Sequence, residues 1–513
     1  MAESRVKKGL LNAKVNLLFY FLSLGLSFFS RKTFLDNLGA EFIGLSGTLS
    51  NILSFLSLAE MGIGTAVAFN LYKPIAENNR KRINDLISVF GYLYNKIGIF
   101  ISIAACIISI FLPLIFKDSN LPLGMIYFSF LSIVFSSLCG YFINYRQILL
   151  SADQKNYLVT KYIQSSILIK LILQIVVAHY LQSCYLWITL EIISSVAVCF
   201  LLNWKINKEY PWLRASIKHG KSVYPQNKQI ITYTKQIFIH KIKDFLLSQS
   251  DQILIFAFVS LKMVAYYGNY TLIVSRITRL FLTVIDGFSA SVGNLVAEGN
   301  KEKIINVFWE LFCINFSIAS ILIFSLYHLL EPFITLWLGE EYILGQTILI
   351  LLLVNTFIME ERKAVDLFNN AYGLYADTWS AWAEGIINIS VTIIAALHWG
   401  IIGILLGKII SLLCIVVLWK PYYLFKCGFK EKITIYWKGF ASYGFVFTTT
   451  FLISHQIAIN LPIIPTNFIS WTIYAICIVI CFITSYSIGI YFICPGAKSL
   501  ASRLTFMKRL YKR

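Results

Sequence analysis

Charge is scarce in this chain of 513 residues. Only 13% of the residues are Asp, Glu, Lys or Arg, against about 25% in a typical soluble domain. Hydrophobic residues make up 58% of the chain, and the mean hydropathy is +0.72. A soluble protein of this composition could not cover its surface with polar groups. The apolar excess therefore predicts an integral membrane protein.

Motifs of enzyme chemistry are also lacking. The sequence has no Walker A, HExxH or GxSxG motif, and its six histidines are scattered. The ten cysteines show no CxxC or Cys/His spacing of a metal site, and most lie within apolar stretches. These absences argue against an enzyme, against ATP-driven transport and against a resident metal or cofactor.

Acidic residues are outnumbered, 25 against 44 basic ones, which gives a net charge of +19. The basic residues do not form one patch beside aromatic side chains, so the excess does not indicate nucleic-acid binding. They lie mainly in short segments between apolar stretches. If the N-terminus is cytoplasmic, the outer connections hold only Arg31, Lys32, Lys117 and Lys262. This asymmetry predicts that both termini are cytoplasmic and that inner lysines contact anionic membrane lipids.

Long apolar stretches recur along the chain, each near the roughly 20 residues that a spanning helix needs. They predict an all-α integral membrane fold with about fourteen transmembrane helices. The expected spans are 15–35, 41–70, 86–115, 123–150, 160–181, 184–203, 237–259, 265–296, 304–330, 343–370, 379–398, 400–419, 439–459 and 467–492.

An internal repeat relates the two halves. Residues 76–83 resemble residues 297–304, at an offset of 221, and residues 151–154 resemble residues 375–378, at an offset of 224. Six spans separate the copies, so the halves share one orientation. We therefore expect two pseudo-symmetric bundles of six helices enclosing a central cavity, plus two C-terminal helices.

The repeat also predicts the domain boundaries. These are 1–203 for the N-lobe, 204–236 for a basic cytoplasmic linker, 237–420 for the C-lobe, and 421–513 for the last two helices and a basic tail. Two interpretations of the linker stay open. It is either a tether whose lysines meet anionic headgroups or a docking site for a partner enzyme.

Several stretches resemble bacterial oligosaccharide flippases of the Wzx type, whose superfamily also contains the MATE drug exporters and the lipid II flippases. They are Gly44–Gly64 with the following Leu71–Pro74, Ser289–Asn294, Leu336–Tyr342 and Gly400–Ile404. The resemblance covers the first twelve spans and is most specific around the second and the eighth. The last two spans and the tail match in hydropathy alone.

This resemblance implies a substrate and a location. The substrate would be a short glycan on undecaprenyl pyrophosphate, moved by alternating access from the cytoplasmic to the outer leaflet of a bacterial cytoplasmic (inner) membrane for surface polysaccharide assembly. Polysaccharide polymerases or glycosyltransferases would be partners. The resemblance does not identify the sugars.

Such a substrate needs a polar path across the bilayer. Burying a hydroxyl without a hydrogen-bond partner costs roughly 2–7 kcal/mol, so a glycan with about ten hydroxyls meets a penalty of at least about 20 kcal/mol in hydrocarbon. A water-filled cleft would remove most of this penalty while the lipid tail stays in the bilayer. Fixed cations, arginine above all, would bind the pyrophosphate.

Basic residues within or at the ends of spans are candidates for pyrophosphate or glycan contact. They are Arg31, Arg276, Arg279, Arg362 and Lys363. Arg276 and Arg279 share a helix face, and their alternatives are an ion pair with Asp251 or Asp286 or an interfacial position. Arg31 ends the first span where the family has a basic residue, and its alternative is an interfacial anchor.

Carboxylates within spans are candidates for coupling a proton or sodium ion to transport. They are Glu60, Asp251, Glu310, Asp366 and Glu384. For Glu60, helix packing or a counter-ion role is the alternative. Arg362 and Lys363 directly follow Glu360 and Glu361, so some of these four charges must be neutralised locally.

Two other functions compete with the flippase. A MATE-type proton- or sodium-coupled drug or metabolite antiporter would have a cleft poor in cations and rich in carboxylates and aromatics. A membrane-embedded glycosyltransferase or polysaccharide polymerase would need a sizeable outer loop with catalytic acidic or arginine residues, and the sequence shows no such loop.

Overall fold

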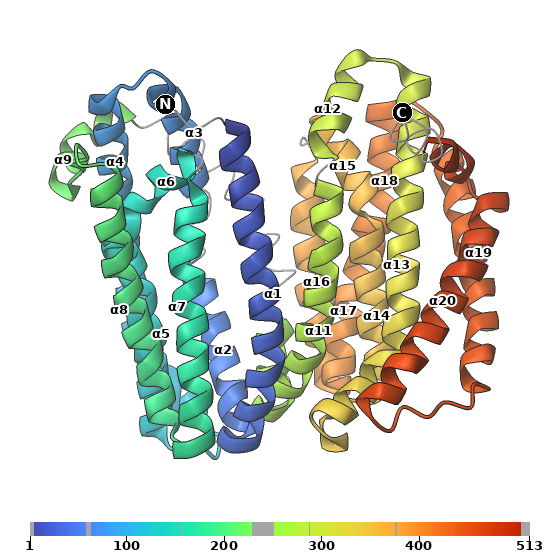
Figure 1. The fold of residues 1–513 in the computed structure, drawn as a ribbon, viewed down its shortest axis with the longest axis horizontal. Helices are drawn as coiled ribbons and strands as arrows, with labels where there is room; N and C mark the ends of the chain where they lie inside the picture. Colours follow the sequence, from blue (N-terminus) through green and yellow to red (C-terminus); the bar gives the residue numbers. More distant parts are fainter. Residues whose placement is uncertain are drawn as a thin grey trace. The chain divides into compact units, whose positions relative to one another are not determined.

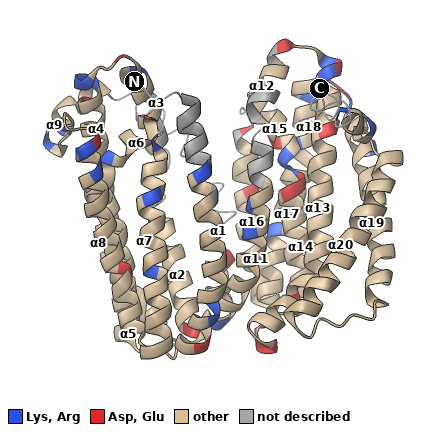
Figure 2. Ribbon diagram, in the orientation of Figure 1, with Lys and Arg blue, Asp and Glu red and all other residues tan. Residues whose placement is uncertain are grey.

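The structure, a computed structural model, describes residues 5–57, 63–153, 155–227, 251–286, 288–374 and 377–503. These residues form helices and short connections, with no β-strand among them (Figure 1). Eight described helices are long and apolar enough to cross a membrane, and α2 (Ala40–Leu56) is a shorter apolar helix. Charged side chains gather mostly towards the helix ends (Figure 2). The predicted all-α membrane fold is confirmed.

The chain divides into two compact units, residues 1–265 and 266–513. The helices of the first unit are α1 (Arg5–Leu38), α2, α3 (Ile63–Ala76), α4 (Arg80–Ile115), α5 (Leu123–Phe142), η2 (Asn144–Gln147), α6 (Ile148–Ala152), α7 (Asn156–Val176), η3 (Val177–Leu181), α8 (Cys184–Glu209), α9 (Ile217–Val223) and η4 (Tyr224–Asn227). Residues 251–258 are also helical.

The helix α11 (Leu261–Asp286) begins in the first unit and continues into the second. The other helices of the second unit are α12 (Ser289–Glu298), α13 (Lys301–Trp337), η5 (Glu340–Tyr342), α14 (Gln346–Glu361), α15 (Lys363–Ala371), α16 (Thr378–Trp399), α17 (Ile401–Leu412), η6 (Leu413–Trp419), α18 (Lys420–Tyr423), η7 (Leu424–Phe429), α19 (Ile433–Ile459) and α20 (Phe468–Ile493).

Some expected spans are interrupted. The stretch 123–150 contains α5 followed by η2 and α6, 265–296 contains α11 and α12, and 343–370 contains α14 and α15. The stretch 41–70 contains α2 and α3, and residues 58–62 between them lie outside the described part of the chain. Hydropathy does not reveal such breaks, because a non-helical residue that is buried in protein can be as apolar as its helical neighbours. Among the described residues, the interruptions fall in the fourth, eighth and tenth expected spans, and the fourth and tenth are equivalent places in the repeat.

The repeat is visible at single residues. Asn79 caps α4 by accepting a hydrogen bond from the backbone N–H of Arg82, at 3.0 Å. Asn300, 221 positions later, caps α13 by accepting one from the N–H of Lys303, at 3.1 Å. Both bonds satisfy a backbone donor that has no partner within its helix. The two capped helices are 36 and 37 residues long.

The expected linker, 204–236, begins within α8, which ends at Glu209, and its next part packs against α4. The backbone N–H of Arg214 donates to Oδ1 of Asn84 at 2.6 Å, and His219 lies 2.7 Å from Asp85. A β-carbon at Gly220 would overlap the carbonyl oxygen of Ser88. Residues 210–227 are therefore folded onto α4, whereas residues 228–236 lie outside the described part of the chain.

The last two long helices, α19 and α20, belong to the core of the second unit. Phe324 of α13 stacks on Phe482 of α20 with ring centroids 4.3 Å apart. Phe312 of α13 meets the fully buried rings of Tyr436 and Tyr443 from α19. These helices bury aromatic surface against α13 rather than standing apart in lipid.

Candidate functional site

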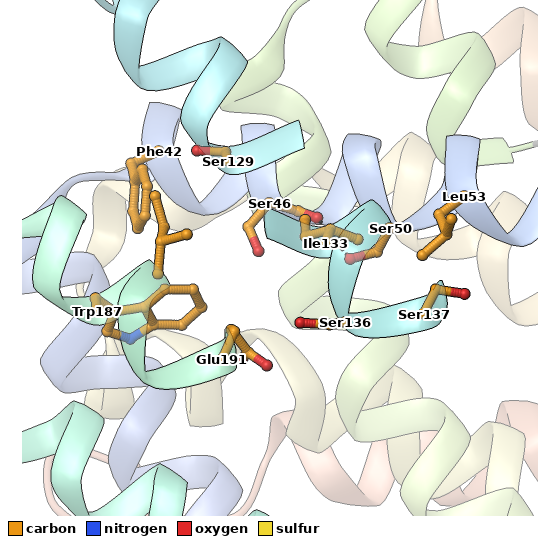
Figure 3. Close-up of a pocket in the computed structure, with 11 residues that line it drawn as sticks. Phe42, Ser46, Ser50, Leu53, Ser129, Ile133, Ser136, Ser137, Trp187 and Glu191 are labelled. Atoms are coloured by element: carbon orange, nitrogen blue, oxygen red, sulfur yellow. Dashed lines mark hydrogen bonds between the residues drawn. The ribbon is translucent and has the colours of Figure 1, made fainter. Parts of the chain in front are cut away.

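A cavity of about 230 Å³ lies inside the first unit, between α2, α5 and α8 (Figure 3). We call it the serine cavity. Its polar lining residues are Ser46 and Ser50 of α2, Ser129, Ser136 and Ser137 of α5, and Glu191 of α8. The spacing of these serines along α2 and α5 places them on the helix faces that meet here.

Some hydroxyls of the serine cavity are satisfied within their own helix. Ser50 donates to the carbonyl of Ser46 at 2.8 Å, and Ser129 donates to the carbonyl of Met125 at 2.7 Å. Among the described residues, the buried hydroxyl of Ser136 and the buried indole N–H of Trp187 have no hydrogen-bond partner. Leaving such groups unpaired is costly, so a polar occupant would stabilise them.

An ion pair closes one side of the serine cavity. Nζ of Lys170, on α7, donates to both carboxylate oxygens of Glu191, at 2.8 and 2.7 Å. The side-chain amide of Gln174 donates to the same carboxylate at 3.2 Å and to the carbonyl of Trp187 at 3.1 Å. The side chains of Lys170 and Glu191 are 17% and 26% exposed. Their opposite charges leave the cavity wall neutral.

Aromatic rings form the apolar wall. Trp187, only 8% exposed, packs edge-to-face on Phe42 with ring centroids 5.5 Å apart, and on Phe34 at 5.4 Å. These contacts fix the indole ring beside Glu191, one helical turn away on α8. The cavity thus combines hydroxyls, a neutralised carboxylate and a rigid aromatic wall.

Of the substrate-binding and ion-coupling residues that the sequence predicted in the first unit, those that the structure describes do not line the serine cavity. Arg31 is half-buried near the end of α1 and donates to the carbonyl of Ala265 at 2.9 Å. Asp251 is 7% exposed. Its neighbour Gln252 accepts a hydrogen bond from Asn51 of α2 at 2.7 Å, so this segment packs on α2. Glu60 lies outside the described residues.

Arg276 and Arg279 both lie on α11, as their spacing predicts. Arg276 is half-buried and Arg279 is exposed. Their contact with pyrophosphate or glycan stays a prediction. The candidate Glu310 of α13 is 5% exposed and lies 3.0 Å from Nε of Arg503.

Four predicted residues meet at the junction of α14 and α15. Nε of Arg362 lies 2.6 Å from Oδ2 of Asp366, and its Nη1 lies 4.0 Å from Oε1 of Glu384 on α16. Lys363 pairs with Glu360. The cations that the sequence assigned to substrate therefore contact carboxylates, two of which it assigned to ion coupling. Opposite charges at this junction therefore neutralise one another locally, as the sequence predicted for some of them.

A buried carboxylate adjoins this cluster. Glu361 is 3% exposed and accepts a hydrogen bond from the hydroxyl of Tyr436 at 3.2 Å. Nearby in the chain, both side-chain atoms of Asn369 are buried and, within the described residues, have no hydrogen-bond partner. The junction of α14 and α15 is thus a buried polar region in the middle of the second unit's helices.

The sequence did not indicate the serine cavity. Serine is common in helices of membrane proteins because it packs closely, so Ser46 and Ser136 carried no signal alone. A signal did exist in Lys170 and Glu191, which are charged residues within two adjacent expected spans. Charged side chains there usually face protein or water, and pairing them would have located the cavity.

The fold defines the class of the protein: a polytopic helical membrane protein whose fold resembles those of a lipid flippase and a multidrug transporter. The lipid II flippase MurJ, in an inward closed conformation, aligns with a TM-score of 0.62 and 15% identity, over 93% of this chain and 98% of that one. A multidrug resistance MATE family transporter, inward-facing, aligns with a TM-score of 0.54 and 12% identity, over 81% of this chain and 97% of that one.

Comparison of the sequence with protein families and with curated proteins identifies no relative: no protein-family model and no curated protein matches the chain. At these identities the structural likeness shows a shared fold, and the resemblance to Wzx-type flippases stays a prediction. Both proteins with this fold are named as a flippase or a transporter rather than an enzyme.

Proposed function

We propose that the protein flips an undecaprenyl-pyrophosphate-linked oligosaccharide across a bacterial cytoplasmic membrane by alternating access. The observation that carries this proposal is the alignment with the lipid II flippase over nearly the whole of both chains. That alignment covers 93% of this chain, whereas the alignment with the MATE transporter covers 81% of it.

The second unit offers support for a lipid-linked substrate. An apolar groove of about 400 Å³ runs between α13, α14 and α19, lined by Tyr327, Leu353, Phe357 and Phe451 among others. An isoprenoid chain needs only such apolar surface, because burying its methylene and methyl groups requires no polar partner. The excess of basic residues in the segments predicted to be cytoplasmic suits a pyrophosphate that starts in the cytoplasmic leaflet.

The coupling of transport to an ion gradient is part of this proposal. A proton or sodium ion would bind a buried carboxylate of the second unit, where Asp366 and Glu384 contact Arg362. Polysaccharide polymerases or glycosyltransferases would act on the two sides of the flipping step.

The MATE-type antiporter is the second candidate, and the alignment with a multidrug transporter favours it. It predicts that purified protein binds cationic drugs. The flippase predicts no such binding and a dependence of surface glycan on the gene.

A gene deletion tests the proposal. We expect lipid-linked repeat units to accumulate in the membrane and surface polysaccharide to disappear, and both to be restored by the wild-type gene. Unchanged surface polysaccharide with no accumulation would refute the flippase assignment. Increased drug sensitivity in the same strain would favour the antiporter.

A further inference from the structure

The serine cavity offers hydrogen bonds without net charge. The carboxylate of Glu191 is balanced by Lys170 at 2.7 Å, so a cation entering the cavity would have to displace the lysine. An anion would meet the carboxylate. Hydroxyls can donate to Glu191 and to carbonyl oxygens, and can accept from Ser136 and Trp187, whose buried donors have no partner among the described residues. The chemistry fits a neutral occupant rich in hydroxyls.

The size of the cavity limits that occupant. About 230 Å³ is below the roughly 300–1,000 Å³ of sites for drug-sized ligands. It excludes an oligosaccharide but admits a single six-membered ring. Trp187 and Phe42 supply an apolar wall on which the C–H face of such a ring can pack.

We propose that the serine cavity binds one neutral sugar ring, a single unit of the transported glycan, between α2, α5 and α8. The assignment of the ring to the transported glycan rests on the proposed function. The cavity itself lies within the first unit and is formed by residues that the sequence did not single out. It would select among sugars through the hydroxyls that reach Glu191 and Ser136.

The competing occupant is water alone. Since each water takes about 30 Å³ in the liquid, the cavity could hold several. Water would satisfy the same donors and acceptors. A cavity that holds only water would give no glycoside binding for a filling side chain to abolish. Filling the cavity with a side chain therefore separates the two occupants.

The experiment uses the purified full-length protein in lipid nanodiscs. The probes are methyl glycosides of hexoses and N-acetylhexosamines, detected by saturation-transfer NMR, which reports weak binding. Ser46→Met and Ser137→Met fill the cavity from two helices. Ser54→Met is the matched control, because Ser54 lies on α2 but does not line the cavity. Thermal unfolding checks that each variant is folded.

A second kind of variant covers the case in which the fillers do not fold. The double variant Lys170→Gln with Glu191→Gln removes the ion pair without leaving an unpaired charge, and it removes the carboxylate acceptor. We expect the fillers and this double variant to bind the glycoside at least about tenfold more weakly than the wild type, and Ser54→Met to bind it equally well.

Three results would overturn the assignment. They are no saturation transfer to any glycoside in the wild type, equal transfer in the filled variants, or equal transfer in the double variant. The proposed function fails separately, if the gene deletion leaves surface polysaccharide unchanged. In that event glycoside binding that the fillers abolish would still establish a sugar site in the cavity.

The same variants test the link to transport. In the deletion strain, Ser137→Met should restore at most about a tenth of the surface polysaccharide that Ser54→Met restores. If deletion removes the polysaccharide and both fillers restore it fully, the flippase function stands and the assignment of the cavity to the glycan falls.

Discussion

Several charged side chains inside the described helices are held in pairs of opposite charge. Lys170 pairs with Glu191, and Arg362 pairs with Asp366. The desolvation of a lone charge in such surroundings is expensive, and an opposite charge offsets much of it. A substitution that changes one member of such a pair should therefore lower the stability of the protein.

Arg362→Gln should destabilise the protein by about 3–5 kcal/mol, because it leaves the buried Glu384 without the guanidinium. The double variant Arg362→Gln with Asp366→Asn should recover part of that loss. Thermal unfolding in one detergent measures both. A single variant with unchanged stability and abolished transport would instead show that Arg362 contacts the substrate.

Gly44→Ala should destabilise the packing of α2 on the start of α11 by about 1–3 kcal/mol, because a β-carbon there would overlap the carbonyl oxygen of Leu261. Gly25→Ala is the matched control, since nothing lies within 4 Å of its β-carbon position in α1. It should be neutral or stabilising by up to about 1 kcal/mol. Equal melting temperatures for the two variants would contradict the close approach at Gly44.

At the scale of elements, hydropathy and the repeat predicted most of what the structure shows. Long apolar stretches became helices because a bilayer requires internally satisfied backbone. The residues matched at the offset of 221 include the two capping asparagines, whose role the sequence did not predict. The breaks near Arg362 and Asn144 could not be predicted from hydropathy, which averages over a single turn.

The packing of residues 210–227 on α4 was equally hidden from the sequence. It depends on the match between Gly220 and the carbonyl of Ser88, and on the hydrogen bond from Arg214 to Asn84. Such contacts involve residues more than a hundred positions apart. A single sequence does not reveal which helix faces meet, and for the same reason the serine cavity was missed.

The two capping asparagines give an element-scale prediction. Asn79→Ala and Asn300→Ala should each cost about 1 kcal/mol, because each leaves one backbone N–H at the start of a long helix without its partner. Asn79→Asp and Asn300→Asp should keep wild-type stability, since a carboxylate accepts the same bond. Thermal unfolding of the four variants measures this. A loss at only one of the two sites would argue that the halves are not equivalent.

At the scale of the whole molecule, the account depends on a fold shared with a lipid flippase along nearly its full length. Under the proposed function no chemical bond changes, so the protein would have to lower only the cost of moving polar groups through hydrocarbon. That cost, at least about 20 kcal/mol for ten unpaired hydroxyls, is large enough that spontaneous flipping would be negligible.

The most direct test of the proposed flipping is to measure which leaflet holds the lipid-linked glycan. In spheroplasts, membrane-impermeant periodate oxidises only the glycan exposed on the outer leaflet. Depletion of the protein should lower the oxidised fraction at least about tenfold, while the total lipid-linked glycan rises. An oxidised fraction that stays the same after depletion would contradict the account.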